Sequence, residues 1–170
     1  MTTAIFSHGK ESGPNGDKIK IMRQVAENYK IRTFSLDYRE CTNAQERVDL
    51  LENFIHNLNN DNLVLIGSSM GGYVSTAVAN EIEVDALFLL CPALYIKNEE
   101  YKLTEYIPKC KHIEIIHGWK DEIIPFENSI KFGKEHKAIL NLIEDNHRLQ
   151  DSHKFIGLRF EAFLKEIYRF

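Results

Sequence analysis

The chain has 170 residues, of which 44% are hydrophobic and 27% are charged, and its formal net charge is −4. This length and balance suit one globular domain, residues 1–170. The sequence has no basic stripe and no apolar stretch of membrane-spanning length, so neither nucleic acid nor a membrane is expected as a partner. A cytoplasmic setting is favoured because no signal peptide is visible and because the cysteines are odd in number (Cys41, Cys91 and Cys110).

Short apolar runs alternate with amphipathic segments along the chain. The predicted strands are residues 4–7, 31–36, 63–66, 86–90, 113–117 and 138–143, and the predicted helices are residues 17–29, 44–58, 70–80, 126–136 and 152–167. Apolar residues at helical spacing, such as Val48, Leu51 and Ile55, indicate the helices. Strands that alternate with helices predict an α/β fold, a compact parallel sheet of about six strands with helices on both faces. Ligands of such sheets bind outside the carboxyl ends of the strands.

The third predicted strand ends at a Gly-Ser-Ser-Met-Gly pentapeptide, Gly67–Gly71. A Gly-x-Ser-x-Gly sequence between a strand and a helix is typical of a nucleophile elbow, a tight turn that holds a serine at the top of a parallel sheet. The turn leaves no room for neighbouring Cβ atoms, which accounts for glycine on both sides. Ser69 has these flanking glycines and Ser68 does not, so Ser69 is the candidate nucleophile. A plain glycine turn is the alternative interpretation.

Two further strand ends supply the partners that a serine nucleophile needs. Asp121 follows the fifth predicted strand and His147 follows the sixth, so the chain order is serine, acid, histidine. This is the chain order of the α/β-hydrolase triad. Residues of the same types are the alternatives: Glu122 for the acid, and His136 and His153 for the histidine. Asp145, close to His147, is interpreted as a turn former.

Across essentially its whole length, the chain resembles the α/β-hydrolase superfamily. The resemblance rests on Gly-Ser-Ser-Met-Gly-Gly at 67–72, His-Gly-x-x-Asp-x-Ile-x-Pro at 117–125 and Asp-Asn-His at 145–147. Together with Ser-His-Gly-Lys-Glu-Ser-Gly-Pro at 7–14, these segments are similar to small bacterial esterase-like hydrolases without a large lid domain. The usual first antiparallel strands are missing from the pattern, and no long insertion is expected after the fourth strand. The resemblance implies a serine hydrolase of the carboxylesterase or thioesterase type (EC 3.1), with no cofactor.

The chemistry of these residues points to acyl transfer to water. His147 would take the proton of the Ser69 hydroxyl, and Asp121 would hold the imidazole tautomer. Backbone N–H groups of Met70 and Lys10 are expected to form the oxyanion hole. The predicted substrates are small-molecule esters or thioesters of small to medium acyl groups, cleaved through an acyl-enzyme. A serine peptidase or amidase with the same triad, and a non-catalytic binding module on this fold, are the alternatives.

Bulky side chains near the strand ends are candidates for the substrate pocket: Tyr73, Pro92, Leu94, Tyr95, Trp119 and Ile124. Core packing is an equally good interpretation of any single one. The lack of material for a lid predicts a preference for short-chain esters. No metal is expected, because the strand-end residues His8 and His117 lie in no metal-binding motif. Lys10 and Lys18 lie near glycines, but the loop is not a phosphate-binding Walker A sequence, and Cys91 is expected to be a small buried hydrophobe.

Overall fold

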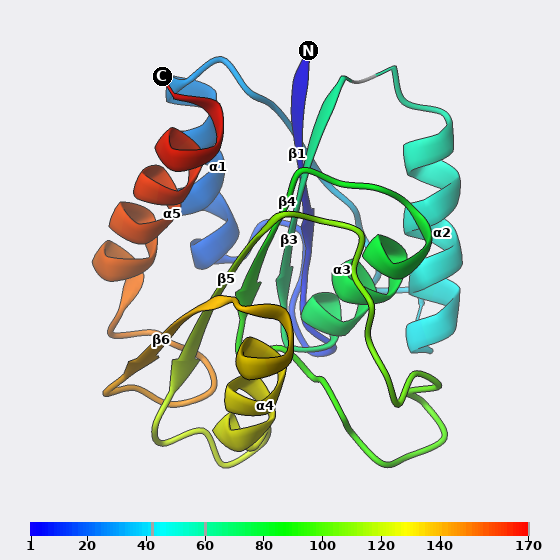
Figure 1. Cartoon of the computed structure of the whole chain (residues 1–170), viewed down its shortest axis with the longest axis vertical. Helices are drawn as coiled ribbons and strands as arrows, with labels where there is room; N and C mark the ends of the chain where they lie inside the picture. Colours follow the sequence, from blue (N-terminus) through cyan, green and yellow to red (C-terminus); the bar gives the residue numbers. More distant parts are fainter. Residues whose placement is uncertain (42, 60, 170) are drawn as a thin grey trace.

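The computed structural model describes residues 1–41, 43–59 and 61–169, in which strands and helices alternate except between the fourth and fifth strands (Figure 1). The strands are β1 (Thr2–Ser7), β2 (Arg32–Ser35), β3 (Asn62–Ser68), β4 (Ala86–Leu90), β5 (His112–Gly118) and β6 (Ile139–Ile143). The helices are α1 (Asp17–Asn28), α2 (Ala44–His56), α3 (Met70–Glu81), α4 (Phe126–His136) and α5 (His153–Tyr168). The predicted order of elements is therefore confirmed.

All six strands form one sheet in the order β2-β1-β3-β4-β5-β6, and every neighbouring pair is parallel. The carboxyl ends of the strands thus meet at one edge, which is the lower edge in Figure 1. The chain proceeds from β1 to β2 in one direction and from β3 to β6 in the other, so the order switches between β1 and β3. Ligand sites in open parallel sheets lie at such a switch point.

The differences from the predicted elements are confined to their ends. The third strand runs to Ser68 rather than to Ile66, because Gly67 and Ser68 still pair with β4, opposite Leu89 and Leu90. The first strand begins at Thr2 rather than at residue 4, because Thr2 pairs with Asn62 of β3. Strand ends depend on pairing with a neighbour, which local sequence does not contain.

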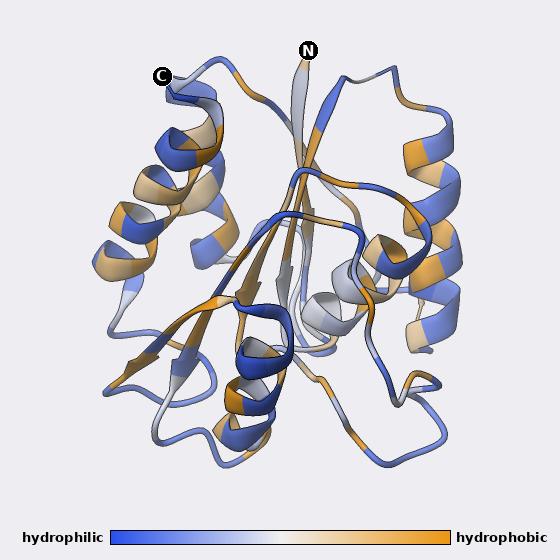
Figure 2. Ribbon diagram, in the orientation of Figure 1, coloured by the Kyte–Doolittle hydropathy of each residue, from blue (hydrophilic) through white to orange (hydrophobic). Residues whose placement is uncertain are grey.

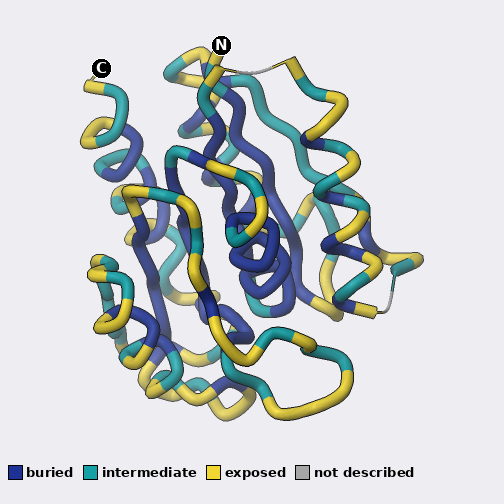
Figure 3. Tube along the Cα trace, turned by 45° about the vertical axis from the view of Figure 1, so that its right-hand side comes forward, coloured by how far each residue is buried: buried dark blue, intermediate teal, exposed yellow. Residues whose placement is uncertain are grey.

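The hydrophobic core consists of two layers, one on each face of the sheet. Alternate strand residues such as Ile5 and Leu65 pack with α2, α3 and α4, whereas their neighbours Phe6 and Ile66 pack with α1 and α5. Figure 2 shows the apolar strands between helices of mixed hydropathy, and Figure 3 shows the central strands β1, β3, β4 and β5, together with α3, as the most deeply buried elements. Within the described ranges, no helix combines the length and the apolar character needed to cross a membrane.

The connection between β4 and β5, residues 91–111, contains neither helix nor strand. It is anchored to α3 instead. The Tyr73 hydroxyl accepts hydrogen bonds from the N–H groups of Lys102 and Leu103 at 3.1 and 3.2 Å, and the N–H of Lys109 donates to the carbonyl of Ala79 at 2.7 Å. This irregular segment takes the place of a crossover helix: it leaves β4 at the edge of the strand ends and returns along the sheet to the start of β5 (Figure 1).

Candidate active site

Ser69 lies in the turn between β3 and α3, at φ 55° and ψ −120°. A non-glycine residue at positive φ is strained, and such strain is typical of functional sites. The flanking glycines permit the turn. A Cβ on Gly67 would lie 2.2 Å from the carbonyl oxygen of Gly71, and one on Gly71 would lie 1.9 Å from the carbonyl oxygen of Ser7. The turn therefore requires glycine at both positions, in agreement with the elbow pattern of the sequence.

Hydrogen bonds connect Ser69 to the two residues that were predicted as its partners, directly to His147 and through it to Asp121. The Nε2 of His147 lies 3.0 Å from Ser69 Oγ, and the Nδ1 of His147 lies 2.6 Å from Asp121 Oδ2. A carboxylate can only accept, so Nδ1 carries the proton and Nε2 is free to accept from the serine hydroxyl. The Asp121 side chain is fully buried, whereas that of His147 is 15% exposed and can be reached by a substrate.

The alternative acid and histidines lie elsewhere. Glu122 is exposed to solvent, whereas the carboxylate of Asp121 points inward. His136 ends α4 and packs its ring against Phe132 at 4.4 Å, and His153 is the first residue of α5. In the part of the chain that the structure describes, none of these alternatives forms a hydrogen bond to Ser69 or His147.

A second histidine contacts the same carboxylate. The Nε2 of His117 lies 2.9 Å from Asp121 Oδ2 and 3.1 Å from the carbonyl oxygen of Ile124. Both are acceptors, so this Nε2 carries the proton, while Nδ1 lies 2.7 Å from the hydroxyl of Ser129. His117 and Ser129 are fully buried. The sequence marked His117 only as a strand-end histidine, although its spacing of four residues from Asp121 was visible.

Hydrogen bonding sets the charge of Asp121. Burial by itself would raise the pKa of this carboxyl group, but hydrogen bonds from His117 and His147 and from the N–H groups of Ile124 and Ile123 outweigh it and lower the pKa. The two N–H groups donate to Oδ1 at 2.9 Å (Ile123) and 2.8 Å (Ile124). The carboxylate therefore stays ionised across the neutral pH range and can orient an imidazole.

The loop after β1 is held by buried side chains. The Nε2 of His8 accepts from the N–H of Tyr38 at 2.9 Å, so its Nδ1 carries the proton and donates to the carbonyl of Gly9 at 2.7 Å. Burial lowers the pKa of His8 and favours this neutral form. Arg47 of α2 donates to the carbonyls of His8 and Gly9 at 3.2 and 3.3 Å. Sequence reasoning missed Arg47, although it lies four residues before Leu51 on the apolar face of its helix.

This arrangement orients the backbone N–H of Lys10. The chain has no cis peptide bonds among its described residues, and in a trans peptide the C=O and N–H point in opposite directions. The N–H of Lys10 therefore points away from the groups that hold the Gly9 carbonyl. A Cβ on Gly9 would lie 3.4 Å from the Cβ of Ser69, so the loop lies against the serine. Met70 follows Ser69 as the first residue of α3, where an N–H has no partner within its own helix.

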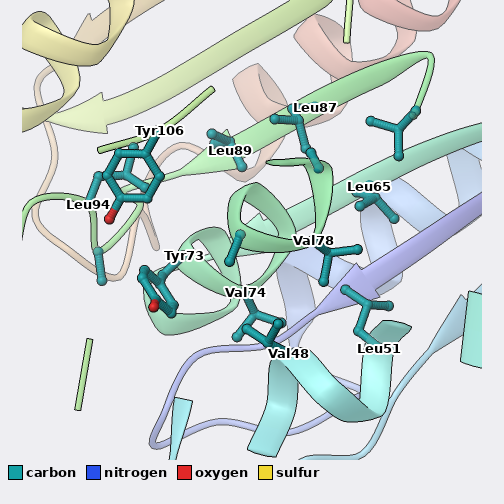
Figure 4. Close-up of a cluster of buried hydrophobic side chains, with 14 of the residues drawn as sticks. Val48, Leu51, Leu65, Tyr73, Val74, Val78, Leu87, Leu89, Leu94 and Tyr106 are labelled. Atoms are coloured by element: carbon teal, nitrogen blue, oxygen red, sulfur yellow. The ribbon is translucent and has the colours of Figure 1, made fainter. Parts of the chain in front are cut away.

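The structure places the predicted pocket residues in several environments. Tyr73, Leu94 and Ile124 are buried in the core layer that contains α3, and Figure 4 shows Tyr73 and Leu94 among its side chains. The Trp119 side chain is 48% exposed and packs edge-on against Phe126, with ring centroids 4.9 Å apart. The other two lie at the edges of this region: Pro92 is buried beside Gly72, and the half-buried Tyr95 donates its hydroxyl to Glu135.

A cavity of about 260 Å³ adjoins the candidate catalytic segments on the other face of the sheet, between α1 and residues 148–153. The predicted pocket residues do not line it. Its lining includes Ser68 and His8, next to the Ser69 turn and the loop that contains Lys10, and Arg148, next to His147. The remaining lining residues are Phe6, Ser7, Ser12, Gly13, Gly16, Asp17, Lys18, Ile19, Met22, Ile66, Gly67, Leu90, Gln150 and His153.

Cys91, His117 and Asp121 offer ligand atoms that all lie within 4.8 Å of one another. In this structure, the side chains of His117 and Asp121 are engaged in hydrogen bonds. His117 and Asp121 bond to each other at 2.9 Å, and burial raises the pKa of the Cys91 thiol.

The fold is that of the α/β-hydrolase superfamily, and the chain is a member of it. The chain belongs to an uncharacterised protein family, UPF0227, whose model matches residues 3–109. A candidate hydrolase of the α/β superfamily from Xanthomonas campestris pv. campestris is 26% identical, with a TM-score of 0.87 over 98% of this chain and 99% of that chain.

Two other solved structures share the fold at lower identity. Est1E from Butyrivibrio proteoclasticus is 18% identical, with a TM-score of 0.80 over 99% of this chain and 89% of that one. A second structure of Est1E, with ferulic acid bound, is 17% identical, with a TM-score of 0.79 over 100% of this chain and 90% of that one. No curated protein sequence matches the chain.

Proposed function

We propose that this protein is a serine hydrolase that cleaves carboxylic esters or thioesters of small to medium acyl groups. Ser69 is the nucleophile, His147 the general base and Asp121 the residue that orients it. The proposal rests above all on the continuous hydrogen-bonded chain from Ser69 Oγ to His147 Nε2, at 3.0 Å, and from His147 Nδ1 to Asp121, at 2.6 Å. A serine hydroxyl needs such a base because it is a weak nucleophile at its ordinary pKa.

The reaction has two halves. In the first, His147 takes the proton of Ser69 Oγ as this oxygen attacks the carbonyl carbon, and the N–H groups of Met70 and Lys10 bind the oxyanion. His147 then gives its proton to the departing oxygen or sulfur, which leaves an acyl-enzyme on Ser69. In the second half, His147 takes a proton from water, whose oxygen attacks the acyl carbon and releases the acid.

Two features favour small acyl groups. Tyr73, Leu94 and Ile124 are packed into the core, and residues 91–111 are bonded down onto α3 rather than forming a lid domain. Butyrate esters of 4-nitrophenol are therefore expected to turn over faster than palmitate esters. A rise in kcat/KM from C4 to C16 would contradict this part of the proposal. Ferulic acid is bound by Est1E, a distant structural relative, which supports a small organic acid or its ester as ligand of this chain.

Labelling with a fluorophosphonate probe tests the proposal. The wild type should be labelled on Ser69, Ser69→Ala should not be labelled, and Ser68→Ala should still be labelled because its neighbour is the nucleophile. Peptide mass spectrometry identifies the modified serine. Absence of labelling in a folded wild type would favour the non-catalytic binding module. A higher kcat/KM for butyryl 4-nitroanilide than for 4-nitrophenyl butyrate would favour an amidase.

A further inference from the structure

The cavity between α1 and residues 148–153 adjoins the candidate active site. Three of its lining residues are chain neighbours of that site: Ser68 precedes the nucleophile, Arg148 follows His147, and His8 precedes the loop that contributes Lys10. Ser69 and His147 do not line the cavity themselves, so a substrate bound at Ser69 would enter it past Ser68 and Arg148.

The cavity has an apolar floor and a cationic rim. The side chains of Phe6, Ile66 and Leu90, at the carboxyl ends of β1, β3 and β4, form part of its floor, and Lys18 and Arg148 lie at its rim. Its volume of about 260 Å³ exceeds the roughly 150 Å³ that is enough to bind benzene. The space thus suits one small ring or a short chain that carries a polar group.

Lys18 is a cation whose charge is incompletely paired. Its ammonium group donates to the carbonyl of Arg148 at 2.8 Å, which uses one of three donors. Within the described ranges, Lys18 forms no ion pair with a carboxylate. Burial lowers the pKa of Lys18, and the like charge of Arg148 acts in the same direction, whereas Asp145 and Asp121 oppose it from beyond ion-pair distance. A buried charge of this kind is stabilised by an anion that reaches its free donors.

The carboxylate of the rim does not supply this anion. Asp17 lies 3.8 Å from Lys20, and its side chain is 76% exposed. The Asp17 carboxylate thus faces solvent toward Lys20, while Lys18 and Arg148 remain to bind a ligand.

We propose that this cavity binds the leaving group of the ester, and that this group is a small alcohol or phenol carrying a carboxylate that Lys18 and Arg148 bind. The inference rests on the proposed hydrolase function. His147 must protonate the departing oxygen, so the leaving group lies on the side of the histidine segment, of which Arg148 is part. The ester C–O bond breaks, the departing oxygen takes the proton of His147, and water later supplies the oxygen of the released acid.

The test compares two butyrate esters of nearly equal shape, 3-carboxyphenyl butyrate and 3-carbamoylphenyl butyrate. In the wild type, kcat/KM for the carboxylate should exceed that for the amide by about tenfold, the effect of one charge-assisted hydrogen bond. Lys18→Met and Arg148→Met should each reduce this ratio about fivefold or more. Arg148→Met keeps the carbonyl to which Lys18 donates, so it removes a charge without removing that bond. Lys20→Met, on the exposed side of the same helix, should leave the ratio unchanged.

The outcomes separate the two proposals. A ratio near one in a wild type that is labelled by fluorophosphonate would overturn the carboxylate site and leave the hydrolase function intact. An equal loss for both esters in Lys18→Met and in Arg148→Met would also overturn it, because these residues would then only position the histidine segment. Failure of both esters, together with absent labelling, would overturn the proposed function itself.

Discussion

His117 and His147 share one oxygen of Asp121, to which their ring nitrogens approach within 2.9 and 2.6 Å. The other oxygen accepts the N–H groups of Ile123 and Ile124 at 2.9 and 2.8 Å. The carboxylate is thereby fixed from both sides, and its orientation does not depend on His147 alone. Fixed orientation is what a residue that aligns a catalytic imidazole must have.

Asp121→Asn should reduce turnover of an activated ester by about ten-thousandfold, the loss known for the equivalent change in a serine protease triad. The amide would place N–H donors against ring nitrogens that also donate, and so favour the wrong tautomer of His147. Glu122→Gln should change turnover less than twofold, because Glu122 is exposed. Steady-state kcat, with circular dichroism to verify folding, decides between the two residues. Equal losses would show that Asp121 is not the triad acid.

His117→Gln should lower kcat about tenfold with little change in KM, because it weakens a charge-assisted hydrogen bond to the catalytic carboxylate and touches no substrate. Active-site titration with fluorophosphonate gives kcat per functional site. Ser129→Ala, which removes the partner of the opposite ring nitrogen, should have a smaller effect in the same direction. If His117→Gln lowers Tm while kcat per titrated site stays at the wild-type value, His117 has only a structural role.

Asp121 also links stability to acid pH. Its pKa in the folded protein lies below the usual 3.8, so the unfolded chain takes up the proton first as the pH falls. The stability contributed by the ionised carboxylate is therefore fully present above about pH 5 and is lost progressively below pH 4. Urea unfolding of wild type and Asp121→Asn should show a difference in unfolding free energy that narrows from pH 6 to pH 3. A difference that stays constant over this range would contradict the lowered pKa.

Gly71→Ala should destabilise the fold by at least the roughly 1–3 kcal/mol that overpacking costs, because its Cβ would lie 1.9 Å from the backbone carbonyl oxygen of Ser7. Gly133→Ala is the matched control. Its Cβ would make an ordinary contact with Leu140 at 3.8 Å inside α4, and alanine favours a helix over glycine by about 0.5–1 kcal/mol. Thermal unfolding should move in opposite directions for the two variants. Equal Tm values would mean that the elbow tolerates a side chain.

The sequence predicted the fold and the members of the candidate triad because both depend on patterns along the chain. The spacing of Gly67 and Gly71 indicates a turn. Asp121 and His147 each follow a parallel strand, so they lie at the same edge of the sheet wherever the helices pack. Pocket shape has no such local signal. Tyr73 was predicted to line the substrate pocket. Its hydroxyl instead accepts hydrogen bonds from residues 91–111, a segment whose sequence has no periodicity.

The roles of His117 and Arg47 were also hidden from the sequence. Each acts through the direction of a buried side chain: His117 toward the carboxylate of Asp121, and Arg47 toward the carbonyls of His8 and Gly9. Spacing alone can place a residue on the inner face of a helix or at a strand end. Spacing does not say which carboxylate or carbonyl oxygen that residue will reach.

The packing of α5 on the sheet has a consequence for how the protein folds during its synthesis. Phe160 of α5 lies edge-on to Phe6 of β1 and Phe88 of β4, with ring centroids 6.3 and 5.0 Å apart. During synthesis these sheet residues emerge long before their cover, and His147 emerges just ahead of it. Until α5 has emerged, the nascent chain thus carries an uncovered apolar surface, of the kind that promotes aggregation. When α5 docks, it covers that surface, and His147 has by then emerged to complete the candidate triad.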